Sequence, residues 1–326
     1  MDEALKDQFG RRFAYLRLSI TDVCNFRCEY CLPDGYQGTP RGFLGRGEIQ
    51  RLIGYFARLG IRKLRLTGGE PLVRRDVLDI VRDAAATPGI ERLAMTTNGY
   101  RLVDLAQPLR EAGLDAINIS LDSLDSENFE RITGDRRHVQ VMAGVEAALA
   151  TGFEQVKINT VLLRGLNDFE VADFVEYVRE RALSVRFIEL MRTRDNSDYF
   201  DQRHVRALAV AQQLEADGWT RYQREATDGP AIEFSHPDYA GRIGFITPYA
   251  AGFCDGCNRL RVTARGGLRL CLFGDGTRDL RPLLQDDAQE TAFRESVFDA
   301  LFHKTAGHRL HEGDYGDTPH LAMTGG

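Results

Sequence analysis

The chain has 326 residues, and its formal net charge of -6 argues against non-specific nucleic-acid binding, which needs a basic field. A hydrophobic content of 43% suits a globular protein with a buried core, and no uninterrupted apolar stretch is long enough to cross a membrane. The acidic amino terminus has no apolar run after it, which favours a cytoplasmic protein.

Short apolar runs alternate with longer amphipathic ones from residue 15 to about residue 189, as in a chain of βα units. Strands are expected near 15–20, 63–67, 92–96, 115–120, 156–161 and 185–189, and helices near 48–59, 76–86, 103–112, 138–150, 169–181 and 205–216. Six such units are too few for a closed eight-stranded barrel. We therefore predict an α/β fold, an open six-stranded (β/α)6 partial TIM barrel over residues 1–218, with working side chains at the carboxyl ends of its strands.

The first two predicted strands each carry an arginine in mid-strand. Arg17 lies between two leucines, and Arg65 repeats this pattern on the next strand. Period-two geometry puts each arginine on the face opposite its leucine neighbours. An arginine that points into a barrel is costly unless an anion meets it, so the pair suggests an anionic ligand inside. The alternative is that both arginines face solvent on the outer surface.

Three cysteines follow the first strand, Cys24, Cys28 and Cys31, with Tyr30 directly before the last. Three thiolates are one short of completing a zinc site or a cubane iron–sulfur cluster, so one metal position stays open for a ligand. This motif resembles that of the radical S-adenosylmethionine (SAM) enzymes. The resemblance implies a 4Fe-4S cluster on the three cysteines, with SAM on its open iron. A zinc site, or a disulfide with one spare thiol, is the alternative.

The next three strand ends carry small or polar residues. The stretch 67–71 reads Thr-Gly-Gly-Glu-Pro, in which paired glycines let a ligand approach the backbone. It resembles the radical SAM motif that contacts the amino group of SAM, and its second glycine is Gly69. Thr96 and Ser120 end the third and fourth strands, where their hydroxyl groups could meet ribose or phosphate oxygens. Helix caps or plain turns are the alternative at each position.

A smaller unit is predicted over residues 219–326, beginning with strands near 219–223, 231–234 and 242–246. It carries a second triplet, Cys254, Cys257 and Cys271, again one thiolate short of a closed site. All six cysteines fall in the two triplets, which indicates metal binding in a reducing compartment. Gly266 and Gly267 fit a hairpin turn that returns Cys271 to the other two cysteines. A zinc site completed by a histidine is the alternative.

Two arginines leave the second triplet on one face of a strand. Arg259 and Arg261 are two residues apart, and their guanidinium groups suit phosphate. A radical SAM core followed by C-x2-C-x13-C, with Asn-Arg-Leu-Arg between, is similar to the GTP 3',8-cyclase family of molybdenum cofactor biosynthesis. The similarity covers nearly the whole chain, including the terminal Gly325-Gly326, which in that family reaches the active site.

The resemblance implies two 4Fe-4S clusters, SAM as a cofactor and GTP as the substrate. Taken alone, Lys157 would be read as a surface group and Met191 as a packing residue. The SAM contacts that the resemblance implies are Tyr30, Gly69, Ser120 and Met191. The implied GTP contacts are Arg17, Arg65, Thr96, Lys157, Arg259 and Arg261, with catalytic roles for Arg17, Arg259 and Arg261.

The implied reaction starts when the reduced first cluster splits SAM into methionine and a 5'-deoxyadenosyl radical. This radical takes the C3' hydrogen of GTP, and the new carbon radical attacks C8 to give (8S)-3',8-cyclo-7,8-dihydroguanosine 5'-triphosphate. The open iron of the second cluster would bind the guanine. The family also implies an external electron donor and product transfer to the next pathway enzyme, cyclic pyranopterin monophosphate synthase, with a monomer or homodimer acting away from membranes and nucleic acids.

Two other functions fit parts of the pattern. The nearer is another radical SAM enzyme with an auxiliary cluster, such as a peptide-modifying maturase. Arg259, Arg261 and the terminal glycines argue against it. The farther is a non-enzymatic protein that uses both cysteine triplets for structural zinc.

Overall fold

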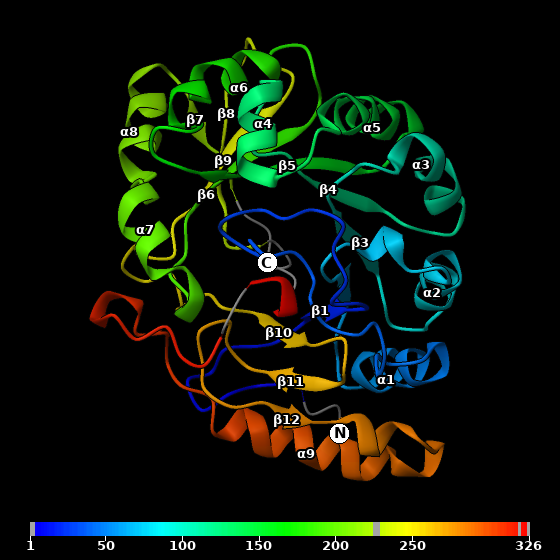
Figure 1. The fold of residues 1–326 in the computed structure, drawn as a ribbon. Helices are drawn as coiled ribbons and strands as arrows, with labels where there is room; N and C mark the ends of the chain where they lie inside the picture. The colour runs from blue at the N-terminus through cyan, green and yellow to red at the C-terminus, as the bar shows by residue number, and fades with distance from the viewer. Residues whose placement is uncertain (1–3, 224–228, 319–320, 325–326) are drawn as a thin grey trace.

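A computed structural model describes residues 4–223, 229–318 and 321–324. The strands form a twelve-stranded sheet in the order β12-β11-β10-β1-β2-β3-β4-β5-β6-β9-β8-β7. The sheet curves around a central space, and helices cover its outer side (Figure 1). Strands β12 and β7 stand at the two ends of this order, so the barrel is open.

The six predicted strands form the middle of this sheet, side by side in chain order and all parallel. Their core-facing side chains are buried, as expected of parallel strands that are covered on both faces. The strands are β1 (Tyr15–Ser19), β2 (Lys63–Thr67), β3 (Arg92–Thr97), β4 (Ala116–Ser120), β5 (Gln155–Leu162) and β6 (Ser184–Glu189). The helices between and after them are α1 (Arg46–Arg58), α2 (Val77–Ala85), α3 (Leu102–Glu111), α4 (Ser126–Thr133), α5 (His138–Thr151), α6 (Val171–Tyr177), α7 (Ser197–Arg203) and α8 (Leu208–Ala216).

Sequence reasoning missed α4 and α7 and made two other helices too long. Helix α4 has a clear start, because the Asp125 carboxylate accepts hydrogen bonds from the amides of Glu127 and Asn128. It ends at Gly134, whose φ of 63° suits a residue without a side chain. The helix expected at 205–216 begins later, as α8, and the one expected at 169–181 is shortened to α6.

The strands beyond residue 219, which the sequence predicted as part of a smaller unit, join the core sheet. Strand β9 (Arg242–Ile246) pairs in parallel with β6, and β8 (Ile232–Ser235) and β7 (Thr220–Arg221) continue that edge in antiparallel fashion. At the other edge β10 (Arg259–Val262) pairs in parallel with β1, followed by β11 (Gly267–Arg269) and β12 (Arg278–Asp279). The later part of the chain therefore extends both edges of the core sheet, and a domain boundary at residue 218 stays a prediction.

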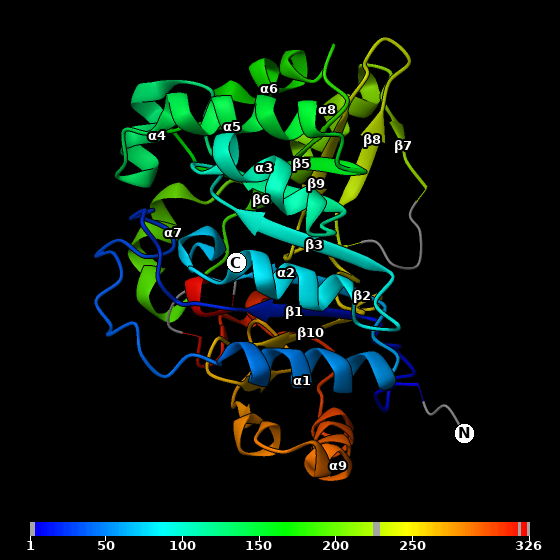
Figure 2. The same cartoon turned by 90° about the vertical axis from the view of Figure 1, so that its right-hand side faces the viewer.

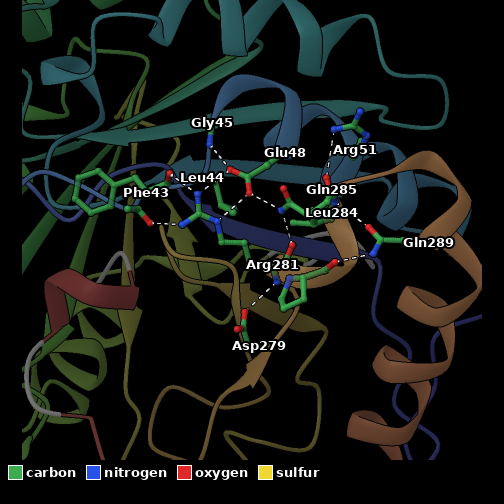
Figure 3. Close-up of polar contacts among 12 residues, drawn as sticks. Phe43, Leu44, Gly45, Glu48, Arg51, Asp279, Arg281, Leu284, Gln285 and Gln289 are labelled. Atoms are coloured by element: carbon green, nitrogen blue, oxygen red, sulfur yellow. Dashed lines mark hydrogen bonds and ion pairs between the residues drawn. The ribbon is translucent and has the colours of Figure 1, made fainter.

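An arginine of the C-terminal part binds the segment at the start of α1 (Figure 3). Nε of Arg281 donates to Glu48 at 2.8 Å, and its NH1 group donates to the carbonyl of Gly42 at 2.7 Å. Gln285 also donates to Glu48, at 2.8 Å. Burial alone would raise the pKa of Glu48, but the hydrogen bonds from Arg281 and Gln285 outweigh it and lower the pKa to about 2. This cluster attaches the end of the chain to the first βα unit.

Helix α9 (Glu290–Phe302), which sequence reasoning also missed, covers α1 from outside (Figure 2). Its Phe293 packs edge-on against Tyr55 and Phe56 of α1, with ring centroids 5.1 and 5.2 Å apart. Short 3-10 helices fill the remaining connections: η1 (Pro71–Val73), η2 (Asp168–Glu170), η3 (Arg194–Asn196), η4 (Arg281–Leu284), η5 (Asp287–Gln289), η6 (Leu310–Glu312) and η7 (Leu321–Thr324). Within the described residues, none of the helices has the length and apolar character needed to cross a bilayer.

Candidate active site

A cavity of about 250 Å³ lies inside the curve of the sheet. Every site residue predicted from the sequence lines this cavity, although the ligand of each residue stays a prediction. These residues are Arg17, Cys24, Cys28, Tyr30, Cys31, Arg65, Gly69, Thr96, Ser120, Lys157, Met191, Cys254, Cys257, Arg259, Arg261 and Cys271. The fold thus brings together side chains that are up to 254 positions apart in the chain, from Arg17 to Cys271.

The first triplet lies on the loop after β1, and α4 anchors this loop through the backbone. The amides of Arg27 and Glu29 donate to carbonyl groups at the end of α4, at 2.9 and 3.1 Å. The amide of Cys31 donates to the carbonyl of Cys28 at 3.0 Å, which closes a turn. All three cysteines are free thiols and partly buried. They stand at the carboxyl ends of the strands, where the barrel rule predicts a site.

The paired glycines after β2 make room for the cysteine loop. A side-chain carbon on Gly68 would lie 2.3 Å from the carbonyl oxygen of Thr21, and one on Gly69 would lie 2.5 Å from that of Val23. The amide of Gly69 donates to the carbonyl of Thr21 at 2.9 Å. The structure shows close packing of two backbones at these glycines. Approach of a ligand to Gly69, which also lines the cavity, stays a prediction.

Both carboxylate oxygens of Glu70 accept hydrogen bonds that hold neighbouring segments of the site together. Oε1 accepts hydrogen bonds from the amide of Leu72 at 2.8 Å and from the hydroxyl of Thr97 at 2.7 Å, and Oε2 accepts from the amide of Asn98 at 2.6 Å. The side chain of Asn98 then donates to Asn25 on the cysteine loop at 2.9 Å. Burial outweighs these bonds and raises the pKa of Glu70 to about 7. Glu70 therefore joins the ends of β2 and β3 to the first triplet.

The other predicted SAM residues lie around the first triplet. The Tyr30 hydroxyl donates to Asp122 at 2.8 Å, and Asp122 also accepts from the amide of Val161 at 2.8 Å. Burial raises the pKa of Asp122 to about 6. Ser120 ends β4, and Met191 follows β6. Strand ends from both halves of the core sheet therefore converge on this side of the cavity.

The second triplet is held on a hairpin, as predicted. Strands β10 and β11 pair in antiparallel fashion on either side of the turn at Gly266. This arrangement brings Cys271 close enough to Cys254 and Cys257 for their charges to interact. His308, which sequence reasoning missed, also lines the cavity, and its backbone amide donates to the sulfur of Cys254.

The two triplets lie at opposite ends of the same pair of strands. The first triplet follows β1, whereas Cys254 and Cys257 precede β10, and Cys271 follows β11, which runs against β10. Strands β1 and β10 are parallel, with Tyr15 opposite Arg259. Strand β1 has 5 residues. At about 3.3 Å per residue it separates the two ends by about 16 Å.

Three arginines form a row across neighbouring strands between the triplets. Arg17 of β1 is the register partner of Arg261 of β10 and of Arg65 of β2. All three line the cavity, so the alternative that Arg17 and Arg65 face solvent is wrong. Like charges directly opposite one another destabilise a sheet. A bound anion would offset this repulsion.

Tyr15 lies in the next row, between Arg259 and Lys63. Burial raises its pKa, but the charges of Arg65, Arg17 and Lys63 outweigh burial and bring the pKa down to about 7. Burial and the neighbouring arginines lower the pKa of Arg17 well below its usual range. Arg65 also donates to the hydroxyl of Thr96 at 3.1 Å. This wall of the cavity therefore carries a cluster of cationic side chains, although the formal net charge of the whole chain is negative.

Lys157 lies on the other side of the cavity, in an ion pair. Its Nζ is 2.7 Å from Oε1 of Glu233, and the two side chains are 8% and 10% exposed. Burial and the nearby Arg186 lower the pKa of Lys157 to about 8, despite Glu233. Arg186 donates twice to Asn159, at 3.0 and 2.6 Å. Sequence reasoning missed Arg186 and Glu233, as it missed Lys63.

The two triplets suit polynuclear clusters better than single ions. Among the described residues, no three His, Cys, Asp or Glu side chains converge closely enough to hold one metal ion. A cubane takes each cysteine on a different iron, which allows a wider spacing. Burial raises the pKa of Cys24 to about 11 and that of Cys31 to about 12. A metal cation beside these thiols would lower their pKa and stabilise the thiolate form that a cluster needs.

The last described segment, η7, lies inside the open barrel next to β1 (Figure 1). The hydroxyl of Ser19 donates to the carbonyl of Met323 at 3.4 Å, and the amide of Ala322 donates to the sulfur of Cys31. The predicted Gly325-Gly326 tail lies outside the described residues.

Two family models match the chain, Radical SAM superfamily over residues 18–178 and Molybdenum Cofactor Synthesis C over residues 183–310. A GTP 3',8-cyclase of Aeromonas hydrophila is 52% identical over 328 residues, which cover 99% of this chain and 96% of that relative. A GTP 3',8-cyclase of Stenotrophomonas maltophilia is 54% identical over 324 residues, which cover 99% of both chains.

A solved structure of Streptococcus suis SuiB bound to S-adenosylmethionine has a similar fold. It matches 89% of this chain and 68% of its own, with a TM-score of 0.64 and 13% sequence identity. That likeness supports the radical SAM fold alone. Identity above 50% along nearly the whole length goes further, and it shows that the chain belongs to the GTP 3',8-cyclase family of radical SAM enzymes.

Proposed function

We propose that this chain converts GTP into (8S)-3',8-cyclo-7,8-dihydroguanosine 5'-triphosphate, with SAM and two 4Fe-4S clusters as cofactors. The main support is one cavity with a cysteine triplet at each end and three register-paired arginines between them. The relatives are named for this reaction, which favours it over a peptide-modifying maturase.

Cys24, Cys28 and Cys31 would hold the first cluster. When bound, this cluster and SAM supply the radical that removes the C3' hydrogen of GTP. The protein itself would position SAM, and the hydrogen bonds that fix the strand ends around the first triplet suit this role. Glu70 joins two of them to the cysteine loop, and Asp122 fixes the Tyr30 side chain beside the triplet.

The arginine row would bind the triphosphate of GTP. Arg17, Arg65 and Arg261 present guanidinium groups that match phosphate oxygens in pairs, and bound phosphates would relieve the repulsion among them. Lys157 would contact GTP from the opposite wall. Arg259 lies two residues before Arg261 on the same strand, β10, and would act beside the second triplet.

Cys254, Cys257 and Cys271 would hold the second cluster, with one position left for the guanine base. GTP would then span the cavity, with its sugar toward SAM and its base toward the second triplet. Such placement brings C3' and C8 into reacting distance, and an enclosed cavity protects reactive intermediates from side reactions. An external donor must supply electrons.

The test is anaerobic turnover of the reconstituted protein with SAM, a strong reductant and GTP deuterated at C3'. Deuterium in 5'-deoxyadenosine, together with the cyclised nucleotide, would support both the chemistry and the substrate. Unlabelled 5'-deoxyadenosine would retain the radical SAM chemistry and reject GTP as the hydrogen donor. A Cys271→Ser variant is the matched control, because we expect it to lose about four of roughly eight irons and to stop cyclisation.

A further inference from the structure

An N-terminal hairpin, residues 5–13, contacts the loop that carries Cys254 and the turn that follows α9. Its two arms meet in a bridge between Lys6 and Arg12. Oδ1 of Asp7 accepts hydrogen bonds from the amides of Phe9 and Arg11, both at 3.0 Å. These local bonds fix the shape of the hairpin and direct the Arg11 side chain toward the C-terminal part of the chain.

Arg11 binds two segments that meet at the second triplet. Its Nε donates to Asp7 at 2.6 Å, its NH1 group donates to the carbonyls of Cys254, at 3.1 Å, and Ala306, and its NH2 group donates to the carbonyl of Thr305 at 2.7 Å. The Arg11 side chain is 8% exposed and that of Asp7 is 0% exposed. Arg11 therefore ties the Cys254 loop to the turn at 305–307, and Asp7 balances its charge.

Lys304 is a second buried cation at the same triplet. It is 4% exposed, and its Nζ donates to the carbonyl of Leu270, the residue before Cys271. The same Nζ lies 5.6 Å from the ring centroid of Phe13 in the hairpin. Lys304 interacts electrostatically with Cys257 and Cys271. Its ammonium group therefore lies beside the backbone that leads into Cys271, and its charge acts on two of the three sulfurs.

Lys304 reaches the triplet from outside the proposed GTP site. It lines a separate outer cleft together with Cys271 and His303, and it is not among the residues that line the inner cavity. Cys271 lines both. A change at position 304 can thus alter the metal centre without removing a contact to GTP.

We propose that Lys304 raises the reduction potential of the second cluster and that Arg11 is the positioning residue that holds the cluster loop on the N-terminal hairpin. This inference rests on the second 4Fe-4S cluster of the proposed function. Reduction adds one negative charge to a cluster, so a buried cation beside its thiolates stabilises the reduced form. Asp7 is bonded to Arg11, and these two groups have opposite electrostatic effects on Lys304, whose own charge also acts on Cys257 and Cys271.

The first test measures the midpoint potential of the second cluster by EPR-monitored redox titration. The full-length chain is used with Cys24, Cys28 and Cys31 replaced by serine, so that the EPR signal comes from the second cluster. Lys304→Gln should lower the ratio of reduced to oxidised cluster about tenfold at a fixed solution potential, which equals about 59 mV for a one-electron couple. Lys304→Arg keeps the charge and should keep the potential. Lys6→Gln, an exposed lysine of the same hairpin, is the matched control.

The second test measures the loss of iron from the second cluster to a chelator. Arg11→Gln should lose iron at least about tenfold faster, as expected when a supporting contact of a metal ligand is removed. Arg12→Gln changes the adjacent, exposed arginine and should match the unsubstituted protein. Equal rates for the Arg11 and Arg12 variants would overturn the role of Arg11.

The outcomes for Lys304 separate charge from structure. Wild-type potentials in both Lys304 variants, or loss of the cluster from both, would overturn the electrostatic role. A wild-type second triplet that takes up no iron would instead reject the second cluster of the proposed function. If the triple serine chain does not fold, the titration is repeated on the intact holoenzyme with SAM added, because SAM changes only the signal of the cluster that binds it.

Discussion

Replacing Lys157 with glutamine tests the opposite wall of the cavity. The variant removes a cation that lies 2.7 Å from Glu233 and leaves this largely buried carboxylate without its partner. A hydrogen bond to a charged group contributes about 1.5–3 kcal/mol, and the unpaired carboxylate adds repulsion toward the triphosphate. We therefore expect GTP binding to weaken by about 3 kcal/mol, or about 100-fold.

The double variant Lys157→Gln/Glu233→Gln separates the two parts of this loss. It removes the carboxylate as well, so the repulsion disappears while the lost hydrogen bond is not regained. We expect it to bind GTP about tenfold more tightly than Lys157→Gln does. Anaerobic titration calorimetry near neutral pH measures all affinities, with Lys6→Gln as a control for an exposed lysine.

The pH dependence gives an independent check on Lys157. Burial and Arg186 lower its pKa to about 8, so the wild-type cavity loses this positive charge as the pH rises through that value. Tyr15, with a pKa of about 7, titrates in both proteins, so the additional fall in GTP affinity above about pH 8 in the wild type relative to Lys157→Gln reports on Lys157. An affinity of Lys157→Gln within about twofold of the wild type, or a double variant no tighter than the single one, would refute the reasoning.

Three further predictions concern carboxylates and their partners. Glu70→Gln removes one acceptor from a carboxylate that accepts three hydrogen bonds at 2.6 to 2.8 Å. The variant should bind SAM about tenfold more weakly in anaerobic equilibrium dialysis. Unchanged binding would show that these hydrogen bonds do not support the SAM site. The folded-state pKa of Glu48 is about 2 against an ordinary 4.5, so its stabilisation by Arg281 is present above pH 4.5 and is lost toward pH 2. At neutral pH the Glu48→Gln variant should thus have a lower melting temperature than the wild type, and near pH 2 the two melting temperatures should coincide. An equal difference in melting temperature at both pH values would contradict the assignment. Tyr30→Phe removes a bond to buried Asp122 and should lower the free energy of unfolding by about 1–3 kcal/mol in thermal unfolding, and no change would show that this bond is not needed.

Local periodicity predicted much of the core and part of the site. Arg17 and Arg65 were placed inside the barrel because alternation along a strand puts every second residue on one face. By the same rule, Lys63 lies two residues before Arg65 and shares its face of the strand. Arg186, in the middle of β6, likewise lies on the cavity side. These two cations were therefore available from the pattern and were missed.

Long-range pairing is the part that the pattern could not supply. Strand β10 pairs with β1, although Arg261 and Arg17 are 244 positions apart. The local sequence of neither strand identifies the strand with which it pairs. Glu233 was missed for the same reason. Its strand, β8, was expected in a separate unit, whereas β8 reaches the core sheet by pairing with β9. Contacts that depend on the order of the strands could not be predicted from local sequence patterns and are seen only in the structure.

The pairing of β1 with β10 determines more of the proposed chemistry than either cysteine motif does alone. Parallel pairing puts the loop after β1 and the loop before β10 at opposite ends, about 16 Å apart for 5 residues. The register places Arg17 level with Arg261, so an anion held there lies between the two cysteine triplets. A slip of one residue would turn β10 arginines to the outer face, and a slip of two would move the second triplet by about 7 Å along the strand. The strand register therefore sets how far the radical source stands from the base that the carbon radical must reach.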